Sequence, residues 1–122
     1  IGSPAMNFIP GTLRRQGERV WVEADDGTAL PAEGAAGGHG RRVVYGLRPE
    51  HIALANGHGG ISAQVLVVEP TGAETNVVVD MAGCQVTAVF NERRALRPGE
   101  RVTLTSPPGL VHLFDAGSGD HL

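Results

Sequence analysis

Glycine and proline divide this chain into short apolar blocks, and that division limits the fold more than any other feature. The chain has 18 glycines and 8 prolines among 122 residues, and turn residues interrupt the apolar pattern about every eight to twelve residues. Between these breaks the apolar residues alternate with polar ones or form short runs, and no segment has the period of an amphipathic helix. The sequence therefore predicts an all-β domain of short antiparallel strands.

The clearest strands lie in the second half of the chain. Residues 61–69, 74–80 and 84–90 carry alternating apolar side chains separated by turn residues, so we expect a three-stranded antiparallel meander. In the first of these strands, Val65 and Val67 are expected to lie on the same face, because side chains two apart share one face of a strand.

Shorter strand patterns precede and follow the meander. Further strands are expected at residues 11–15, 19–24, 42–48, 102–104 and 110–114. The glycine-rich residues 34–40 are expected to form a flexible loop. This many short strands in a chain of this length fits one compact barrel of the oligonucleotide/oligosaccharide-binding (OB) type, or two such small units that share strands.

The chain contains no lysine, and this excludes two kinds of chemistry. All ten basic residues are arginines. A phosphate-binding P-loop needs a lysine to reach the β- and γ-phosphates, and Schiff-base catalysis needs an amine. No nucleophile, base and orienting group can be placed together. We therefore expect that this chain is not an enzyme by itself and binds no cofactor.

Charge, cysteine content and hydropathy exclude other classes. The formal net charge of −3 gives no basic field to attract nucleic acid. Cys84 is the only cysteine, so an internal disulfide cannot form and a reducing compartment is expected. No apolar run approaches the roughly 20 residues that span a bilayer. The start of the chain lacks a methionine and the features of a signal peptide, so we expect a fragment or a processed product.

Four motifs occur in the same order as in one known family. They are Gly-Ser-Pro-Ala-Met-Asn-Phe at 2–8, Tyr-Gly-Leu-Arg-Pro-Glu-His at 45–51, Val-Val-Glu-Pro-Thr-Gly-Ala-Glu-Thr at 67–75 and His-Leu-Phe-Asp at 112–115. Together they resemble the C-terminal regulatory domain of the ATP-binding subunit of bacterial ABC importers for maltose, trehalose or glycerol 3-phosphate. The resemblance covers nearly the whole chain.

This resemblance implies an OB-like, TOBE-type small β-barrel. Residues 1–10 would be a junction from a missing ATPase domain, and residues 11–122 would be the regulatory domain. ATP and Mg²⁺ would bind in that missing domain, whereas no cofactor would bind in this chain. The implied partners are a second copy of the same subunit, the membrane permease subunits and a regulatory protein, with no nucleic acid. The implied location is cytoplasmic, at the inner face of the bacterial cell membrane.

Ten residues of these motifs are candidate interface or regulatory residues. They are Arg48, Pro49, Glu50, His51, Glu69, Gly72, Glu74, Thr75, Phe114 and Asp115. Proline ends a strand and fixes the direction of its neighbours, so Arg48 is expected to pair with Glu50, Glu69 or Glu74, either within the domain or at a subunit interface. Gly72 suits a turn with positive φ. Phe114 fits an interface anchor or a residue that closes the barrel.

The residues leave several alternatives open. A carboxylate pair such as Glu69 and Glu74 can serve acid–base catalysis, although a turn with capping hydrogen bonds is favoured. Trp21 and Tyr45 are aromatic residues that an OB fold could stack on nucleic acid bases. The five histidines, His39, His51, His58, His112 and His121, lack the spacing of a metal site, so no metal is expected. The competing functions are a module that binds a small oxyanion or sugar in another ABC importer ATPase, and a nucleic-acid-binding OB fold.

Overall fold

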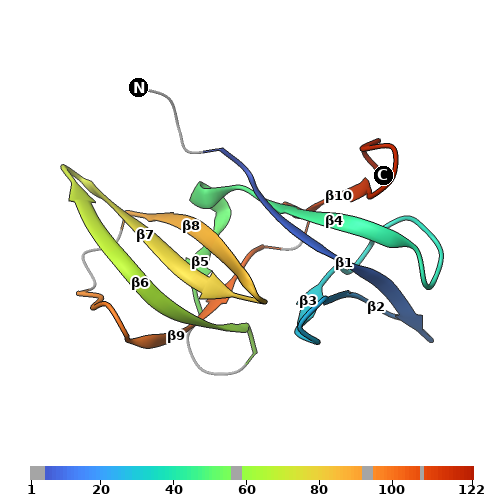
Figure 1. Ribbon diagram of the computed structural model, residues 1–122, viewed down its shortest axis with the longest axis horizontal. Helices are drawn as coiled ribbons and strands as arrows, with labels where there is room; N and C mark the ends of the chain where they lie inside the picture. The colour runs from blue at the N-terminus through green and yellow to red at the C-terminus, as the bar shows by residue number, and fades with distance from the viewer. Residues whose placement is uncertain (1–4, 56–58, 92–94, 108) are drawn as a thin grey trace.

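A computed structural model describes residues 5–55, 59–91, 95–107 and 109–122, and within them the chain forms two five-stranded antiparallel sheets (Figure 1). The first sheet has the strand order β10-β4-β1-β2-β3 and the second has the order β5-β9-β6-β7-β8. The first sheet contains β1 (Asn7–Gln16), β2 (Arg19–Ala24), β3 (Ala29–Pro31), β4 (Arg42–Leu47) and β10 (His112–Asp115). The second contains β5 (Ala53–Leu54), β6 (Ile61–Thr71), β7 (Glu74–Met81), β8 (Cys84–Phe90) and β9 (Arg101–Thr105).

The two halves of the chain exchange one strand each. Strand β5 belongs to the first half but pairs with β9 in the second sheet, and β10 from the end of the chain pairs with β4 in the first sheet. A short 3₁₀ helix, η1 (Pro49–His51), follows β4 and contacts β8. The all-β class is therefore confirmed, and the chain forms two small units that share strands, the second of the two architectures left open by the sequence.

Each sheet is built around one long strand that serves two neighbours. In β1 the first residues pair with β4 and the last with β2, and β6 divides its length between β9 and β7 in the same way. Pro10 and Pro70 lie where their strand has only one neighbour. Proline lacks a backbone N–H, and a strand position with only one neighbour tolerates this loss, so each long strand can contain a proline.

One hydrophobic core cluster includes side chains from both sheets. Ile9, Leu13 and Val43 from the first sheet and Val77 and Val79 from the second are fully or almost fully buried in it. Burial of aliphatic side chains on one face of each sheet supplies the main favourable free energy of such a fold. The two sheets therefore share a core.

Asn7 links the sheets through its side-chain amide. Its Nδ2 donates to the carbonyl oxygens of Leu47 at 3.2 Å and Thr87 at 2.8 Å, and its Oδ1 accepts from the Thr87 N–H at 2.9 Å. Thr87 belongs to β8, an edge strand whose free N–H and C=O groups would otherwise be open to another strand. Asn7 thus provides hydrogen-bond partners for the N–H and C=O groups of Thr87 and joins this edge strand to the first sheet.

Several strand predictions need correction. Val67 does not share the core face with Val65, because the pairing of β6 with β7 shifts between these two residues. Such a bulge inserts one extra residue and reverses the alternation that follows it, so Val67 is 51% exposed and Val68 packs against the core. The short edge strands β3 and β5 were not predicted.

The expected segment 34–40 is not a free loop. Arg15 donates through its side chain to the carbonyl oxygens of Gly37, at 2.6 Å, and Ala35. The Arg15 N–H donates to Nδ1 of His39 at 2.9 Å, and the Gly40 N–H donates to the Leu13 carbonyl oxygen at 2.7 Å. The segment is therefore tied to β1 at several points.

The first strand starts earlier than the sequence predicted. β1 begins at Asn7, so residues 7–10 pair with β4 inside the first sheet. The division into a junction at 1–10 and a domain at 11–122 stays a prediction, and residues 1–4 and His58 lie outside the described residues. No helix among the described residues is long and apolar enough to cross a membrane.

Candidate interaction surface

An exposed aromatic cluster lies across strands β1, β4 and β10. Phe8 is 57% exposed, and its ring meets the ring of Phe114 edge to face at a centroid distance of 5.9 Å. The two rings, together with Val44, line a shallow and mainly apolar hollow of about 330 Å³. Phenylalanine side chains left open to water in this way are typical of interaction surfaces.

The strand register brings these rings together. Phe8 lies opposite Gly46 of β4, and Gly46 in turn lies opposite His112 of β10. A Cβ atom on Gly46 would approach the Sδ atom of Met6 to 2.7 Å and Cε2 of Phe114 to 2.9 Å. The absence of a side chain at Gly46 therefore makes room for the aromatic cluster.

Two histidines extend the cluster. His112 Nδ1 and His121 Nε2 lie 3.1 Å apart, and the His121 ring contacts Phe114 at a centroid distance of 5.1 Å. Partial burial lowers the pKa of His112, and the positive charges of His121, Arg48 and His51 lower it further. His112 therefore resists protonation.

Asp115 is committed to local structure beside this cluster. Its carboxylate accepts hydrogen bonds from the backbone N–H groups of Ser118, at 2.7 Å, and Gly117, at 2.9 Å, and forms an ion pair with Arg41 at 3.0 Å. The Ser118 N–H, followed by Arg41, lowers the pKa of Asp115 to about 2. This predicted interface residue thus stabilises the turn after β10.

The Arg-Pro-Glu-His motif lies at the end of β4, near the histidines. Pro49 is buried and starts η1, as expected for a residue that ends a strand. The expected ion pair of Arg48 within the domain is not formed: the three ion pairs among the described residues involve other arginines. The alternative pairing of Arg48 at a subunit interface stays a prediction. Arg48 is exposed, Glu50 is exposed, and His51 is half-buried.

The other predicted residues lie far from this surface. Glu69, Gly72, Glu74 and Thr75 lie at the end of the β6–β7 hairpin, which is at the opposite end of the molecule from β10 (Figure 1). Gly72 has a φ of 69°, which confirms its turn role. The Thr71 hydroxyl lies 3.4 Å from the carbonyl oxygen of Glu74 within this hairpin. The structure therefore divides the ten candidates between two separate places.

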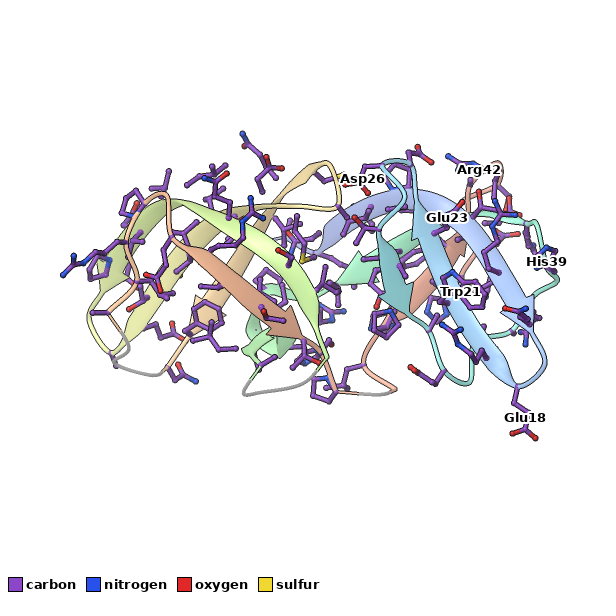
Figure 2. The ribbon with its side chains drawn as sticks, turned by 90° about the horizontal axis from the view of Figure 1, so that it is seen from below. Glu18, Trp21, Glu23, Asp26, His39 and Arg42 are labelled. Carbon is purple, nitrogen blue, oxygen red and sulfur yellow. The ribbon has the colours of Figure 1, made fainter. Side chains whose placement is uncertain are left out.

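The aromatic platform for nucleic acid that the sequence left open as an alternative is not present as a pair. Tyr45 is buried, and its hydroxyl donates to the carbonyl oxygen of Pro31 at 2.6 Å. Trp21 is half-buried on β2, the strand that also carries Glu23 (Figure 2), and the Arg19 guanidinium lies 4.9 Å from its ring centroid. Tyr45 cannot stack on a base, and Trp21 already has a cationic neighbour.

Two arginines of the first sheet are bound to neighbouring acids. Arg14 pairs with Glu23 at 3.0 Å, and Arg42 pairs with Asp25 at 2.8 Å. The hydrogen bond from Arg42 lowers the pKa of Asp25. These ion pairs neutralise the charges of Arg14 and Arg42.

A second hollow, of about 260 Å³, lies beside the C-terminal residues. It is lined by Pro31, Ala32, Glu33, Gly34, Ala35, Ala36, Ser106, Gly109, Val111, Leu113, His121 and Leu122. The buried Oγ of Ser106 has no hydrogen-bond partner among the described residues. Among the residues that the structure describes, no arginine lines this hollow, so they offer little attraction for an anion. Among the described residues, no group of three or more His, Cys, Asp or Glu side chains is arranged to hold a metal.

Sequence reasoning gave no role to three residues that the structure singles out. Asn7 and Phe8 belong to the first motif but follow no recognisable chemical pattern, and His121 was considered only as one of five histidines without the spacing of a metal site. One signal for the aromatic cluster was available: Phe8 is a phenylalanine close to Pro10 in a chain with few aromatic residues. Asn7 could not be found in this way, because its partner Thr87 is 80 residues away.

Comparisons with known proteins agree with this architecture. The model of the MalK OB fold domain matches residues 2–52, and the model of the TOBE domain matches residues 45–114. The two matches overlap at the end of β4, close to where the chain passes from the first sheet to the second.

Two curated relatives and one solved structure are similar to the chain. The uncharacterized ABC transporter ATP-binding protein y4oS of Sinorhizobium fredii is 46% identical, over 98% of this chain and 32% of the relative. The sn-glycerol-3-phosphate import ATP-binding protein UgpC of Salmonella typhi is 36% identical, over 100% of this chain and 34% of the relative. The cytoplasmic molybdate-binding protein ModG has a TM-score of 0.72 at 17% identity, over 93% of this chain and 96% of that one, which shows a shared fold alone.

The chain thus spans about one third of the length of the curated relatives it matches. Both halves of its fold have a matching family model, and the resemblance carried by the four sequence motifs is confirmed. The chain belongs to the TOBE-domain family, with a MalK-type OB fold in its first half, as found in the ATP-binding proteins of ABC importers.

Proposed function

We propose that this chain is the regulatory and dimerisation domain of an ABC importer ATP-binding protein that powers the uptake of sugars or sugar phosphates. The observation that carries the proposal is the pair of family matches, to the MalK OB fold and the TOBE domain, across most of the chain. The relatives named above are ATP-binding proteins about three times as long as this chain. The ATP and Mg²⁺ sites are accordingly proposed for the remaining length, since this chain has no lysine for a P-loop.

The proposed partners follow from this role. They are a second copy of the subunit, the membrane permease subunits reached through the ATPase part, and a regulatory protein. The proposed location is the cytoplasmic side of the membrane. The solute is not encoded in the described surface, so its class rests on relatives such as UgpC.

The aromatic cluster supports self-association through the first sheet. Phe8 and Phe114 form an exposed apolar patch bordered by the Arg41–Asp115 ion pair. An aromatic centre with a charged rim is the usual anatomy of an interface. We expect weak pairing of this chain by itself, because the ATPase parts of a complete subunit would add contact area.

Sedimentation velocity over a wide concentration range tests this role. Phe8→Ser should weaken self-association, since it removes the most exposed aromatic side chain of the cluster. Val67→Ser is a matched control, because Val67 is similarly exposed, at 51%, but belongs to the second sheet. A chain that stays monomeric at high concentration, or equal weakening by both variants, would contradict dimerisation through this surface.

A small-ligand module is the second candidate, and one observation favours it. The hollow beside the C-terminal residues contains the unpartnered Ser106 hydroxyl, and a buried polar group without a partner is costly. Because the described lining of the hollow includes Glu33 and no arginine, a neutral sugar fits better than an oxyanion. Equilibrium dialysis against maltose, glycerol 3-phosphate, molybdate and tungstate separates these outcomes, and saturable binding of any of them favours the second candidate.

A further inference from the structure

A pair of histidines connects the C-terminal residues to strand β10. His112 Nδ1 and His121 Nε2 lie 3.1 Å apart, and the two ring centroids lie 5.3 Å apart, so the rings meet nearly end to end. In such a contact one ring nitrogen donates its N–H and the other accepts it. The pair therefore holds a single proton between the two rings.

Backbone hydrogen bonds place the same residues along the free edge of the first sheet. The Leu122 N–H donates to the Leu113 carbonyl oxygen, and the Asp115 N–H donates to the Asp120 carbonyl oxygen, both at 2.8 Å. Residues Phe114 and His121 form an isolated antiparallel bridge. Residues 120–122 thus cover the edge of β10, and Leu122 packs against the core.

The surroundings of the pair oppose a second positive charge. His121, Arg48 and His51 are the charged neighbours that lower the pKa of His112. Among the nearby carboxylates, Asp115 already forms an ion pair with Arg41 and accepts a hydrogen bond from the Ser118 N–H. Two carboxylates lie near His121: Asp120 precedes it, and Glu33 lines the same hollow. Neither forms an ion pair with a histidine among the described residues.

Counting protons shows when the contact is lost. A first proton can occupy an outward ring nitrogen and leave the N–H···N bond intact. A second proton must bind the nitrogen that accepts this bond. Two N–H groups then face each other across the contact, and two positive charges repel.

We propose that His112 and His121 form a pH-sensitive latch, whose double protonation releases residues 120–122 from β10 and widens the hollow that His121 and Leu122 line. The latch is independent of the proposed function, since it rests only on contacts within this chain. Release uncovers the edge of β10 and the side chains of Val111 and Leu113, which line the hollow.

The direction of the pH effect follows from proton linkage. In the closed state the pKa of His112 lies below the ordinary value of about 6.5, whereas in the released state it returns toward that value. The released state therefore binds more protons, and falling pH favours it. The latch is closed above about pH 7 and opens as the pH falls below about 6.5 and then through the lowered pKa of His112. The ratio of released to closed chains rises by at most about tenfold for each pH unit.

Hydrogen exchange followed by NMR tests the latch on the whole chain. The protection of the Leu122 amide, corrected for its intrinsic exchange rate, is measured between about pH 7.5 and about pH 5, on both sides of the ordinary histidine pKa. The buffer contains EDTA, so that no metal bridges the two rings. The Val79 amide in the central strand β7 serves as an internal reference for global unfolding.

We expect Leu122 to lose about tenfold of its protection at the low end of this range, while Val79 keeps its own. In His121→Gln the pH dependence at Leu122 should disappear. His39→Gln is the matched control, since His39 bonds to Arg15 away from the latch and should leave the wild-type profile unchanged. Unchanged protection of Leu122 at low pH, a wild-type profile in His121→Gln, or parallel loss at Val79 would each overturn the proposal.

Discussion

The two sheets have matching strand arrangements but differ in what they place on their surfaces. The first sheet contains all three ion pairs found among the described residues, the paired histidines and every aromatic residue except Phe90. In the second sheet the buried side chains are mainly aliphatic and include Val65, Val77 and Val79, and no ion pair or histidine contact is found among its described residues. The same arrangement of strands thus carries ion pairs, histidines and aromatic residues in the first sheet, and mainly buried aliphatic side chains in the second.

This difference indicates a division of roles within one core. The exchanged strands β5 and β10 and the amide of Asn7 prevent either sheet from standing alone. The first sheet can therefore carry exposed aromatic and titratable groups while the second supplies buried aliphatic area. The following predictions test whether the two units act as one body and which contacts join them.

The largest effect is expected from cavities on either side of the shared core. Leu13→Ala in the first sheet and Leu104→Ala in the second should each lower the free energy of unfolding by about 2–5 kcal/mol, because both leucines are fully buried. Urea unfolding followed by Trp21 fluorescence and by circular dichroism should show one transition whose midpoint shifts equally for both probes. If Leu104→Ala left the Trp21 transition in place, the two sheets would be separate folding units.

A smaller effect is expected when the link between the sheets is removed. Asn7→Ala leaves the Thr87 N–H and two carbonyl oxygens without their partner, so we expect a loss of about 1–3 kcal/mol in the free energy of unfolding. Asn91→Ala, at an exposed position, is the control and should change it by less than about 0.5 kcal/mol. Equal effects of the two substitutions would show that Asn7 is not a structural link.

The smallest effect is expected at Tyr45. Tyr45→Phe removes its hydrogen bond to Pro31 and should cost about 1 kcal/mol near neutral pH. Burial, followed by the charge of Glu33, raises the pKa of Tyr45 above its ordinary value. The folded state thus keeps a proton that the unfolded state releases, and stability should fall as pH rises above about 10.

The matched control for this alkaline effect is an aromatic residue of the second sheet. Phe90→Leu changes a buried side chain but removes no titratable group, so the loss of stability above about pH 10 should persist in it. In Tyr45→Phe that loss should shrink. Identical alkaline limbs in wild type and Tyr45→Phe, measured by denaturation at a series of pH values, would refute the assignment to Tyr45.

Local pattern was enough to predict the strands with strong alternation and tight turns. The meander of β6, β7 and β8 was predicted within one or two residues at each end. Its strands alternate clearly, and the turn at Ala82 and Gly83 between β7 and β8 has the positive φ angles that match hairpin twist. The strand before Pro49 was predicted for a similar reason, since proline ends the ladder there.

Other features depend on distant parts of the chain and left no local signal. The bulge that turns Val67 outward results from how β6 pairs with its neighbours, and β3 and β5 are too short to show a period. Arg48 does not pair with Glu69 or Glu74 within the chain, because the hairpin that carries these residues extends to the other end of the molecule. The aromatic surface needed the register of β1, β4 and β10, which no single segment encodes.

The position of Asn7 has a mechanical consequence. It begins the first strand, and its amide grips the backbone of β4 and β8 at the same time. Tension applied to the chain at this point would load both sheets together instead of peeling β1 from its own sheet. Both sheets would then resist such a force together.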